Sequence, residues 1–217
     1  MLFRFMRTIS LMGFGRLSCK PRTSESRDSS HPRGLHNVTC AKCDMDVGVL
    51  STERHSISLF KWQATCETMT HSRAPTAPEC LAATLLASFS RSGSAKAVVL
   101  PIFYESPVEV KSGDIRPPHA EQVLHLWMLN TSISYSSSEE AEGPKNAIKL
   151  LYRIIDRDTA DKLTEPVTSD IQDLSFARDA LDQSISYLDQ SNLLLPEDQR
   201  RYNGFKVGLL IKYSDKN

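Results

Sequence analysis

Two thiols stand three positions apart in the segment HNVTCAKCDM, at Cys40 and Cys43. Cysteines at this spacing form a knuckle, a tight turn whose backbone N–H groups can hydrogen-bond the sulfur atoms, and structural zinc sites often use it. The same spacing occurs in redox motifs, and a single activated thiolate is a nucleophile. The pair therefore leaves three kinds of chemistry open: metal binding, redox exchange and nucleophilic catalysis.

A structural zinc site needs two more ligands, because zinc in such sites is four-coordinate. Cys66 and His71 are the best-placed additional pair of ligands, since we expect Cys66 near the end of a strand and His71 in the loop after it. His36 and Cys80 are alternative donors. A lone cysteine beside a strand or in an alanine-rich helix is, however, usually a small buried hydrophobe. If the knuckle binds Zn²⁺, the candidate ligands are Cys40, Cys43, Cys66 and His71.

The redox and nucleophile hypotheses depend on what surrounds the pair. A thioredoxin-like pair opens a helix after a strand, whereas the residues after Cys43 indicate a strand. For a nucleophile, Lys42 would lower a thiol pKa, while Asp44 and Asp46 would raise it. The sequence thus disfavours redox chemistry and leaves one cysteine of the pair, Cys40 or Cys43, as the candidate catalytic residue.

Signals for other enzyme classes are weak. The chain contains no glycine-rich phosphate-binding loop, no GxSxG motif and no HExxH motif. His119 and His125 stand near apolar strand residues, where we expect a structural histidine rather than a general base. A hydrolase or an oxidoreductase is therefore the least supported class.

The overall composition limits which cellular compartment and which classes of partner we expect. The 217 residues include 26 Lys and Arg against 26 Asp and Glu, which argues against a dedicated nucleic-acid binder. The five cysteines are odd in number and unevenly spaced, which fits a reducing compartment better than a disulfide scaffold. No apolar run approaches the roughly 20 residues that span a bilayer. We expect an intracellular protein with no nucleic-acid or membrane partner.

The first 34 residues differ from the rest. They contain no acidic residue before Glu25, and a helix over residues 2–17 would be basic and apolar, as in a mitochondrial presequence. The segment PRTSESRDSSHPRG is typical of a linker, because nothing apolar in it can pack. We predict a disordered basic extension or presequence-like segment over residues 1–34, and a folded domain over residues 35–217.

Two helices are predicted within the folded part. The segment APECLAATLLASFSRSG has helical spacing, a capping residue at Thr76 and a stop at Gly93. The segment SFARDALDQSISYLDQSN has the same spacing, and Pro196 prevents a continuation. PEDQRR is expected to form a charged helical turn, and residues 156–161 are expected to form a turn.

Alternating patterns and short apolar runs predict the strands. TSISYSSSEEAEGPK is expected to be the edge of a strand that runs into a polar loop. The combination indicates an α+β fold with a mainly antiparallel sheet and about two principal helices. The predicted strands are SISLFKWQATC, KAVVLPIFYE, QVLHLWMLN, NAIKLLYRII and GFKVGLLIKY.

Several stretches, taken together and in order, resemble the HECT-like ubiquitin-conjugating-enzyme-binding proteins, a eukaryotic family described as ubiquitin-protein ligases. The resemblance covers about residues 35–213 and corresponds to the C-terminal half of longer family members. The resemblance implies that the other half of those members contains another cysteine pair. If the two pairs together complete a zinc site, the knuckle here lacks its partner, and a truncated gene product is an open alternative. The matching stretches are VTCAKCDMDVGVL, LFKW, CLAATLLASFSRSGSAKAVVLPI, LHLWMLNTSISYSSS, AIKLLYR and SNLLLPEDQRRYNGFKVGLL.

The resemblance implies a protein that binds a ubiquitin-charged conjugating enzyme and promotes ubiquitin transfer to a substrate protein. Since HECT ligases carry ubiquitin as a thioester on one cysteine, it points to Cys40 or Cys43 as the acceptor. Docking is expected around the helix over residues 176–192 and the segment LLLPEDQRRY. The implied location is the cytoplasm or nucleus, with the mitochondrion as an alternative. The alternative function is a non-catalytic interaction or assembly factor with a structural knuckle, for example in nuclear RNA processing.

Overall fold

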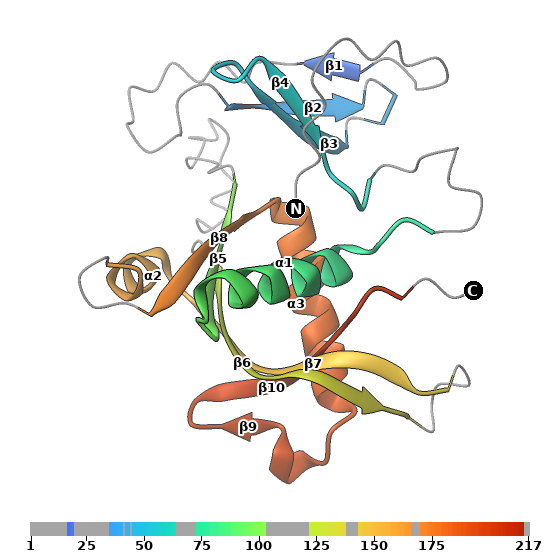
Figure 1. Ribbon diagram of the computed structural model, residues 1–217, viewed down its shortest axis with the longest axis vertical. Helices are drawn as coiled ribbons and strands as arrows, with labels where there is room; N and C mark the ends of the chain where they lie inside the picture. Colours follow the sequence, from blue (N-terminus) through green and yellow to red (C-terminus); the bar gives the residue numbers. More distant parts are fainter. Residues whose placement is uncertain are drawn as a thin grey trace, which may run out of the picture. The chain divides into compact units, whose positions relative to one another are not determined.

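The structure is a computed structural model, and it describes residues 17–19, 35–40, 42–43, 45–63, 73–102, 122–137, 143–165 and 170–214. The chain divides into two compact units (Figure 1). The first consists of Met1–Pro75 with Asp215–Asn217, and the second of Thr76–Ser214. The domain boundary expected after residue 34 stays a prediction.

The first unit contains a four-stranded antiparallel sheet, in the order β1-β2-β3-β4. Val38, Val49 and Phe60 supply buried apolar side chains. No pattern in the sequence predicted β1 or β2, whereas β3 is the strand that the residues after Cys43 indicated. The strands are β1 (Leu17–Cys19), β2 (Leu35–Cys40), β3 (Asp46–Ser51) and β4 (Ser56–Leu59).

The strand predicted over SISLFKWQATC is shorter than expected. β4 ends at Leu59, and the N–H of Gln63 donates to the carbonyl of Phe60 to close a turn. The Phe60 and Trp62 rings stack at 4.8 Å. The alternation through Lys61 and Gln63 was therefore a turn with a stacked aromatic pair, and residues 64–66 lie outside the described part of the chain.

The second unit contains a six-stranded sheet in the order β8-β5-β6-β7-β10-β9. All neighbouring strands are antiparallel except β5 and β8, which are parallel. The predicted α+β class, with a mainly antiparallel sheet and two principal helices, is confirmed. The elements are α1 (Ala77–Ser92), β5 (Lys96–Pro101), β6 (Val123–Tyr135), β7 (Lys145–Ile155), α2 (Arg157–Leu163), β8 (Ile171–Phe176), α3 (Arg178–Leu193), the 3-10 turn η1 (Glu197–Gln199), β9 (Arg201–Tyr202) and β10 (Phe205–Ile211).

Helix α1 begins and ends where its capping residues predicted. The Glu79 carboxylate accepts the Thr76 N–H at 2.8 Å, while the Thr76 hydroxyl accepts the Glu79 N–H, which forms a capping box. Gly93 adopts a φ of 72°, and its N–H donates to the carbonyl of Phe89. A side chain is strained in this left-handed conformation, so glycine suits the helix end.

Two predictions near the C-terminal helix were wrong. Residues 157–163 form helix α2 instead of a turn, with Asp156 capping it by accepting the Thr159 N–H at 2.7 Å. A helix of seven residues is too short to show a helical period. Ser175 and Phe176 end strand β8 instead of opening α3, because β8 pairs with β5, a partner distant in sequence.

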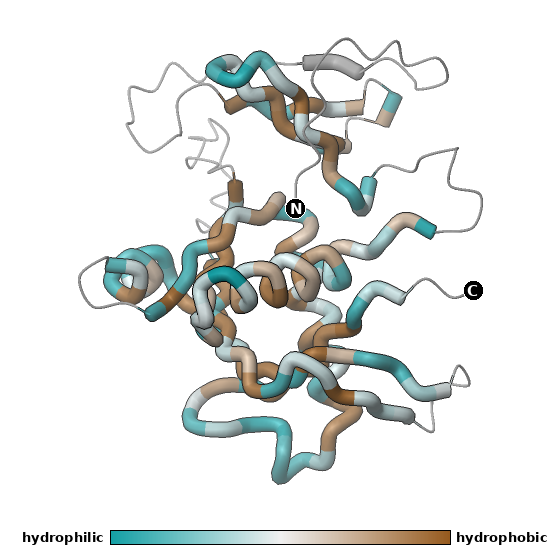
Figure 2. Tube along the Cα trace, viewed as in Figure 1, coloured by the Kyte–Doolittle hydropathy of each residue, from teal (hydrophilic) through white to brown (hydrophobic). Residues whose placement is uncertain are grey.

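Helix α3 packs closely on the sheet of the second unit. A Cβ at Gly208 in β10 would lie 2.8 Å from the Leu188 side chain of α3 and 3.1 Å from the Tyr152 ring of β7. Glycine at this position therefore allows the helix to approach both strands. Helix α1 packs against α3 and β10. Figure 2 shows apolar residues on the central strands and hydrophilic residues along the β9–β10 hairpin.

Helix α2 buries a separate small cluster. Ala160 of α2 packs with Val98 of β5 and Val123 of β6, all three almost fully buried. In the part of the chain that the structure describes, we find no helix long and apolar enough to cross a membrane.

Candidate functional site

The cysteine pair lies in the connection between β2 and β3. Cys40 is the last residue of β2, Cys43 lies in the following turn, and β3 begins at Asp46. The Cys40 N–H donates to the carbonyl of Met45 at 2.9 Å, which closes the turn. The strand predicted after the pair is confirmed, so the pair does not open a helix as a thioredoxin-like motif would.

The knuckle concentrates hydrogen-bond donors on one sulfur. The backbone N–H groups of Lys42 and Cys43, followed by the Cys43 thiol, lower the pKa of the Cys40 thiol. Burial opposes this effect, and the Lys42 ammonium adds a smaller lowering. Cys40 is partly exposed and Cys43 is exposed. The arrangement therefore favours a thiolate at Cys40 that solvent or a partner can approach.

The knuckle supplies two of the four ligands of a zinc site. Within the described residues, no three His, Cys, Asp or Glu side chains come together as a metal site. Cys66 and His71 lie outside the described residues, so the predicted completion of the site stays a prediction. The alternative donor His36 is four residues from Cys40 on the same strand, about 13 Å away along it. Cys80, the other alternative, lies in α1 of the second unit.

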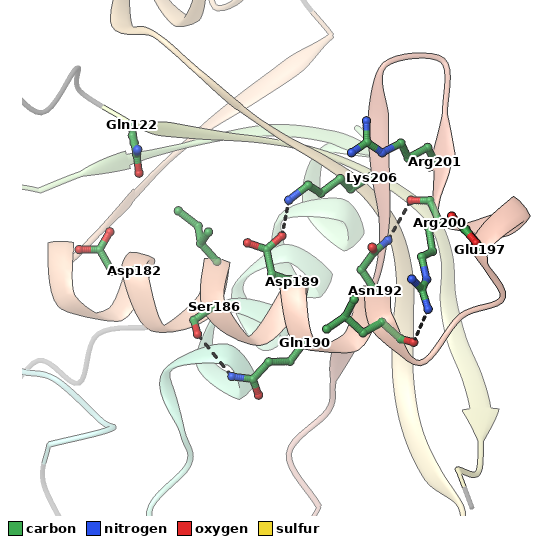
Figure 3. A pocket seen from close by; sticks show the side chains of 12 residues that line it. Gln122, Asp182, Ser186, Asp189, Gln190, Asn192, Glu197, Arg200, Arg201 and Lys206 are labelled. Atoms are coloured by element: carbon green, nitrogen blue, oxygen red, sulfur yellow. Dashed lines mark hydrogen bonds and ion pairs between the residues drawn. The ribbon is translucent and has the colours of Figure 1, made fainter. Parts of the chain in front are cut away.

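A hollow of about 930 Å³ follows the exposed side of α3 in the second unit (Figure 3). Helix α3, η1 and the β9–β10 hairpin provide most of its walls. Its acidic residues lie mainly on the helix, and its basic residues lie on the hairpin side. The residues that line it are Gln122, Asp182, Ile185, Ser186, Asp189, Gln190, Asn192, Leu193, Glu197, Arg200, Arg201 and Lys206.

One carboxylate joins the helix to the sheet at this hollow. The Asp189 carboxylate accepts a hydrogen bond from the Tyr152 hydroxyl at 2.7 Å and from the Lys206 ammonium at 2.6 Å. Burial would raise the pKa of Asp189, but the hydrogen bonds from Lys206 and Tyr152 hold it below its usual value. Burial and the Asp189 charge raise the pKa of Tyr152 well above its ordinary range. Asp189 is thus a charged anchor between α3, β7 and β10.

A second set of bonds fixes the hairpin to the end of α3. The Asn192 amide donates to the carbonyls of Arg200 at 2.8 Å and Val207 at 2.7 Å. The Arg200 guanidinium donates to the carbonyls of Leu193 and Leu195. The Leu193 carbonyl belongs to the last residue of α3, where carbonyls have no partner within the helix, and Leu195 follows two residues later. The walls of the hollow are therefore held in one arrangement.

His125 occupies a buried position on β6. Its Nδ1 accepts a hydrogen bond from the Arg153 guanidinium at 3.1 Å, and its ring lies edge-on to Phe205. Burial, then the charges of Arg153 and Lys96, lower its pKa to about 4. These contacts agree with a structural role, but the buried Nε2 of His125 has no hydrogen-bond partner, so the satisfied histidine that the sequence predicted is met at one ring nitrogen only. His119 lies outside the described residues.

A family comparison bears on both the knuckle and the hollow. The model of the HECT-like ubiquitin-conjugating enzyme (E2)-binding family matches residues 9–207. The chain belongs to this family. The match begins inside the segment 1–34, for which the resemblance gave no counterpart. It covers most of the chain and is not limited to the part from residue 35 onward that the resemblance covered. No curated protein and no solved structure matches the chain.

Membership in this E2-binding family supports the predicted partner, a ubiquitin-conjugating enzyme. The match includes Cys40, Cys43 and every residue that lines the hollow. The hollow also lies where the resemblance predicted docking, along α3 and the segment LLLPEDQRRY.

The sequence did not predict the Tyr152–Asp189–Lys206 contact. A usable signal was present, because Tyr152 falls on the buried face of a predicted strand and a buried tyrosine hydroxyl needs a partner. Which residue would meet it depended on how α3 crosses the sheet, which no local pattern specifies.

Proposed function

We propose that this protein is a ubiquitin-protein ligase that receives ubiquitin on Cys40 from a charged conjugating enzyme and passes it to a substrate protein. The observation that carries the proposal is the set of N–H donors from Lys42 and Cys43 on the Cys40 sulfur. These donors stabilise the thiolate, which is the reactive form of cysteine. Family membership supports the partner.

The transfer consists of two acyl exchanges. In the first, the Cys40 thiolate attacks the thioester carbonyl that joins ubiquitin to the conjugating enzyme, and the thiolate of that enzyme leaves. In the second, a neutral amine of the substrate attacks the new thioester and the Cys40 thiolate leaves. The amine loses one proton, and an amide bond remains. Neither step requires an oxidant or a metal.

Cys40 is favoured over Cys43 because the donors converge on it. The Cys43 thiol itself donates toward Cys40. Cys43 then acts as a positioning residue that helps to hold the negative charge on its neighbour.

A thioester trap tests the proposal. The purified chain is incubated with activated ubiquitin and a panel of conjugating enzymes, and the adducts are separated with and without reductant. We expect a reductant-sensitive adduct on the wild type and on Cys43→Ala, and none on Cys40→Ala. Cys40→Ser should give a reductant-resistant ester, because the hydroxyl replaces the thiol. An unchanged adduct on Cys40→Ala, or no adduct on a folded wild type, would overturn the proposal.

The same donors also favour a second function, a non-catalytic binding module with a structural knuckle. Backbone N–H groups stabilise metal-bound thiolates as well as free ones. In this proposal Cys40 and Cys43 bind Zn²⁺ with Cys66 and His71, and the protein assembles other factors in the cytoplasm or nucleus, for example in RNA processing. Metal analysis separates the two: one zinc per chain that Cys66→Ser removes supports the module, because a zinc-bound thiolate is a poor nucleophile.

A further inference from the structure

We infer that the conjugating enzyme docks in the hollow between α3 and the β9–β10 hairpin, an inference that rests on the E2 binding in the proposed function. The hollow, of about 930 Å³, lies entirely within the second unit. All the residues that line it fall inside the family match. The argument for docking comes from an exposed apolar anchor, unpaired charges and walls connected by hydrogen bonds.

The apolar anchor is Leu193, the last residue of α3. Its side chain lines the hollow and is 64% exposed. Ile185 lines the hollow further along the same helix. An exposed leucine at the rim of a hollow gives a partner an apolar contact that excludes water, as interface anchors do.

Most of the charges in the hollow are already used within the protein. Lys206 is paired with Asp189 at 2.6 Å, and Asp182 is paired with Arg178 at 3.1 Å. Arg200 donates to two carbonyls, one at the end of α3 and one two residues after it. Among the described residues these contacts leave the exposed side chains of Arg201 and Glu197 without an ion pair. A partner can therefore compensate Arg201 at little desolvation cost.

Hydrogen bonds within the chain connect the walls of the hollow to one another. Asn192 ties the helix to the hairpin through two carbonyls, and Asp189 ties it to Tyr152 and Lys206. Figure 3 shows Asp189, Asn192 and Lys206 between α3 and the hairpin. A surface that is already ordered loses little entropy on binding. The docking element of the conjugating enzyme should thus present an apolar side chain to Leu193 and a carboxylate to Arg201.

Calorimetry with the full chain and a panel of uncharged conjugating enzymes tests the inference. We expect Leu193→Asp and Arg201→Glu each to weaken binding at least about tenfold. The affinity of the wild type should also fall with rising salt more steeply than that of Arg201→Ala, because a screened ion pair is lost.

Two matched controls carry the same substitutions at residues that do not line the hollow. Leu129→Asp alters an exposed leucine of β6, and Arg54→Glu alters an exposed arginine between β3 and β4. Both should bind within about twofold of the wild type. Circular dichroism melting of each variant shows that a loss of affinity is not a loss of fold.

The outcomes separate this inference from the thioester proposal. If the hollow variants bind like the wild type, the docking site is wrong even when Cys40 forms its adduct. If they lose binding while no adduct ever forms, the docking site stands and the ligase proposal fails. A wild type that binds no conjugating enzyme overturns both.

Discussion

At Cys40 and His125, the surroundings of a side chain decide its charge in opposite ways. The donors on the Cys40 sulfur favour its charged form, the thiolate. Burial of His125 beside Arg153 disfavours its charged form, the imidazolium. Both effects follow from which form the local field stabilises. The donors at Cys40 therefore support a reactive thiolate, and the burial of His125 supports a neutral imidazole inside the fold.

The buried His125 makes stability depend on pH. Its pKa is about 4 in the folded chain, against about 6.5 in an unfolded one. As the pH falls below about 6.5, the unfolded chain binds a proton that the folded chain excludes, so unfolding becomes easier. The loss reaches about 3 kcal/mol near pH 4. Urea unfolding from pH 7.5 to pH 4 should show it for the wild type.

His125→Phe supplies the comparison, because it keeps a ring beside Phe205 and removes the titration. We expect the wild type to lose stability relative to this variant only between about pH 6.5 and pH 4. If the difference in free energy of unfolding between the wild type and His125→Phe stays constant over that range, it contradicts the prediction, whatever its size at neutral pH.

Among the elements, α3 matters most because it joins the hollow to the sheet. Its position is set by the close contact at Gly208 and by the Asp189 bonds to β7 and β10. Helix α1, by contrast, is defined by local signals at its own ends. The two helices have the same length, 16 residues each. Local signals set both ends of α1, whereas β8 pairing displaced the predicted start of α3.

Asp189→Asn should weaken the attachment of α3. Because Asp189 is partly exposed and charged, we expect a loss of about 1 kcal/mol in the free energy of unfolding at pH 7. Its folded pKa is lowered, so its contribution is full above the ordinary value of about 3.9. The contribution disappears as the pH falls through the lower folded value.

Urea unfolding of the wild type and Asp189→Asn at pH 7 and at pH 3 measures this contribution. Tyr152→Phe is the matched variant, since it removes one hydrogen-bond donor to Asp189 but keeps the aromatic ring and the Lys206–Asp189 ion pair. We expect it to lower the free energy of unfolding less than Asp189→Asn does. An Asp189→Asn effect that is unchanged in acid would show that the carboxylate charge does not hold α3.

For the whole molecule, the two proposed tasks fall in different units. Cys40 belongs to the unit formed by Met1–Pro75, and the hollow belongs to the unit formed by Thr76–Ser214. The surroundings of the thiol that would carry ubiquitin and the surface that would bind the conjugating enzyme are therefore formed by separate sets of contacts. Loss of the thiol need not abolish docking, and loss of docking need not change the thiol.

A fragment of residues 73–217 tests this division. We expect it to bind a free conjugating enzyme with an affinity within about threefold of that of the full chain, because the walls of the hollow are all present. It should form no thioester adduct, since Cys40 is absent. Calorimetry and the thioester trap measure the two properties. A folded fragment that no longer binds would place part of the docking surface in the first unit.

The sequence by itself determined the elements whose signals are local. The capping residues of α1, the short apolar run of β5 and the alternating patterns of β7 and β10 predicted those elements, and the spacing of Cys40 and Cys43 predicted the knuckle. Only the tertiary structure decided which distant residues meet: β8 against β5, Asp189 against Tyr152 and Lys206, and Arg200 against the end of α3. Local propensity acts within a few residues, whereas these contacts depend on how complete elements pack.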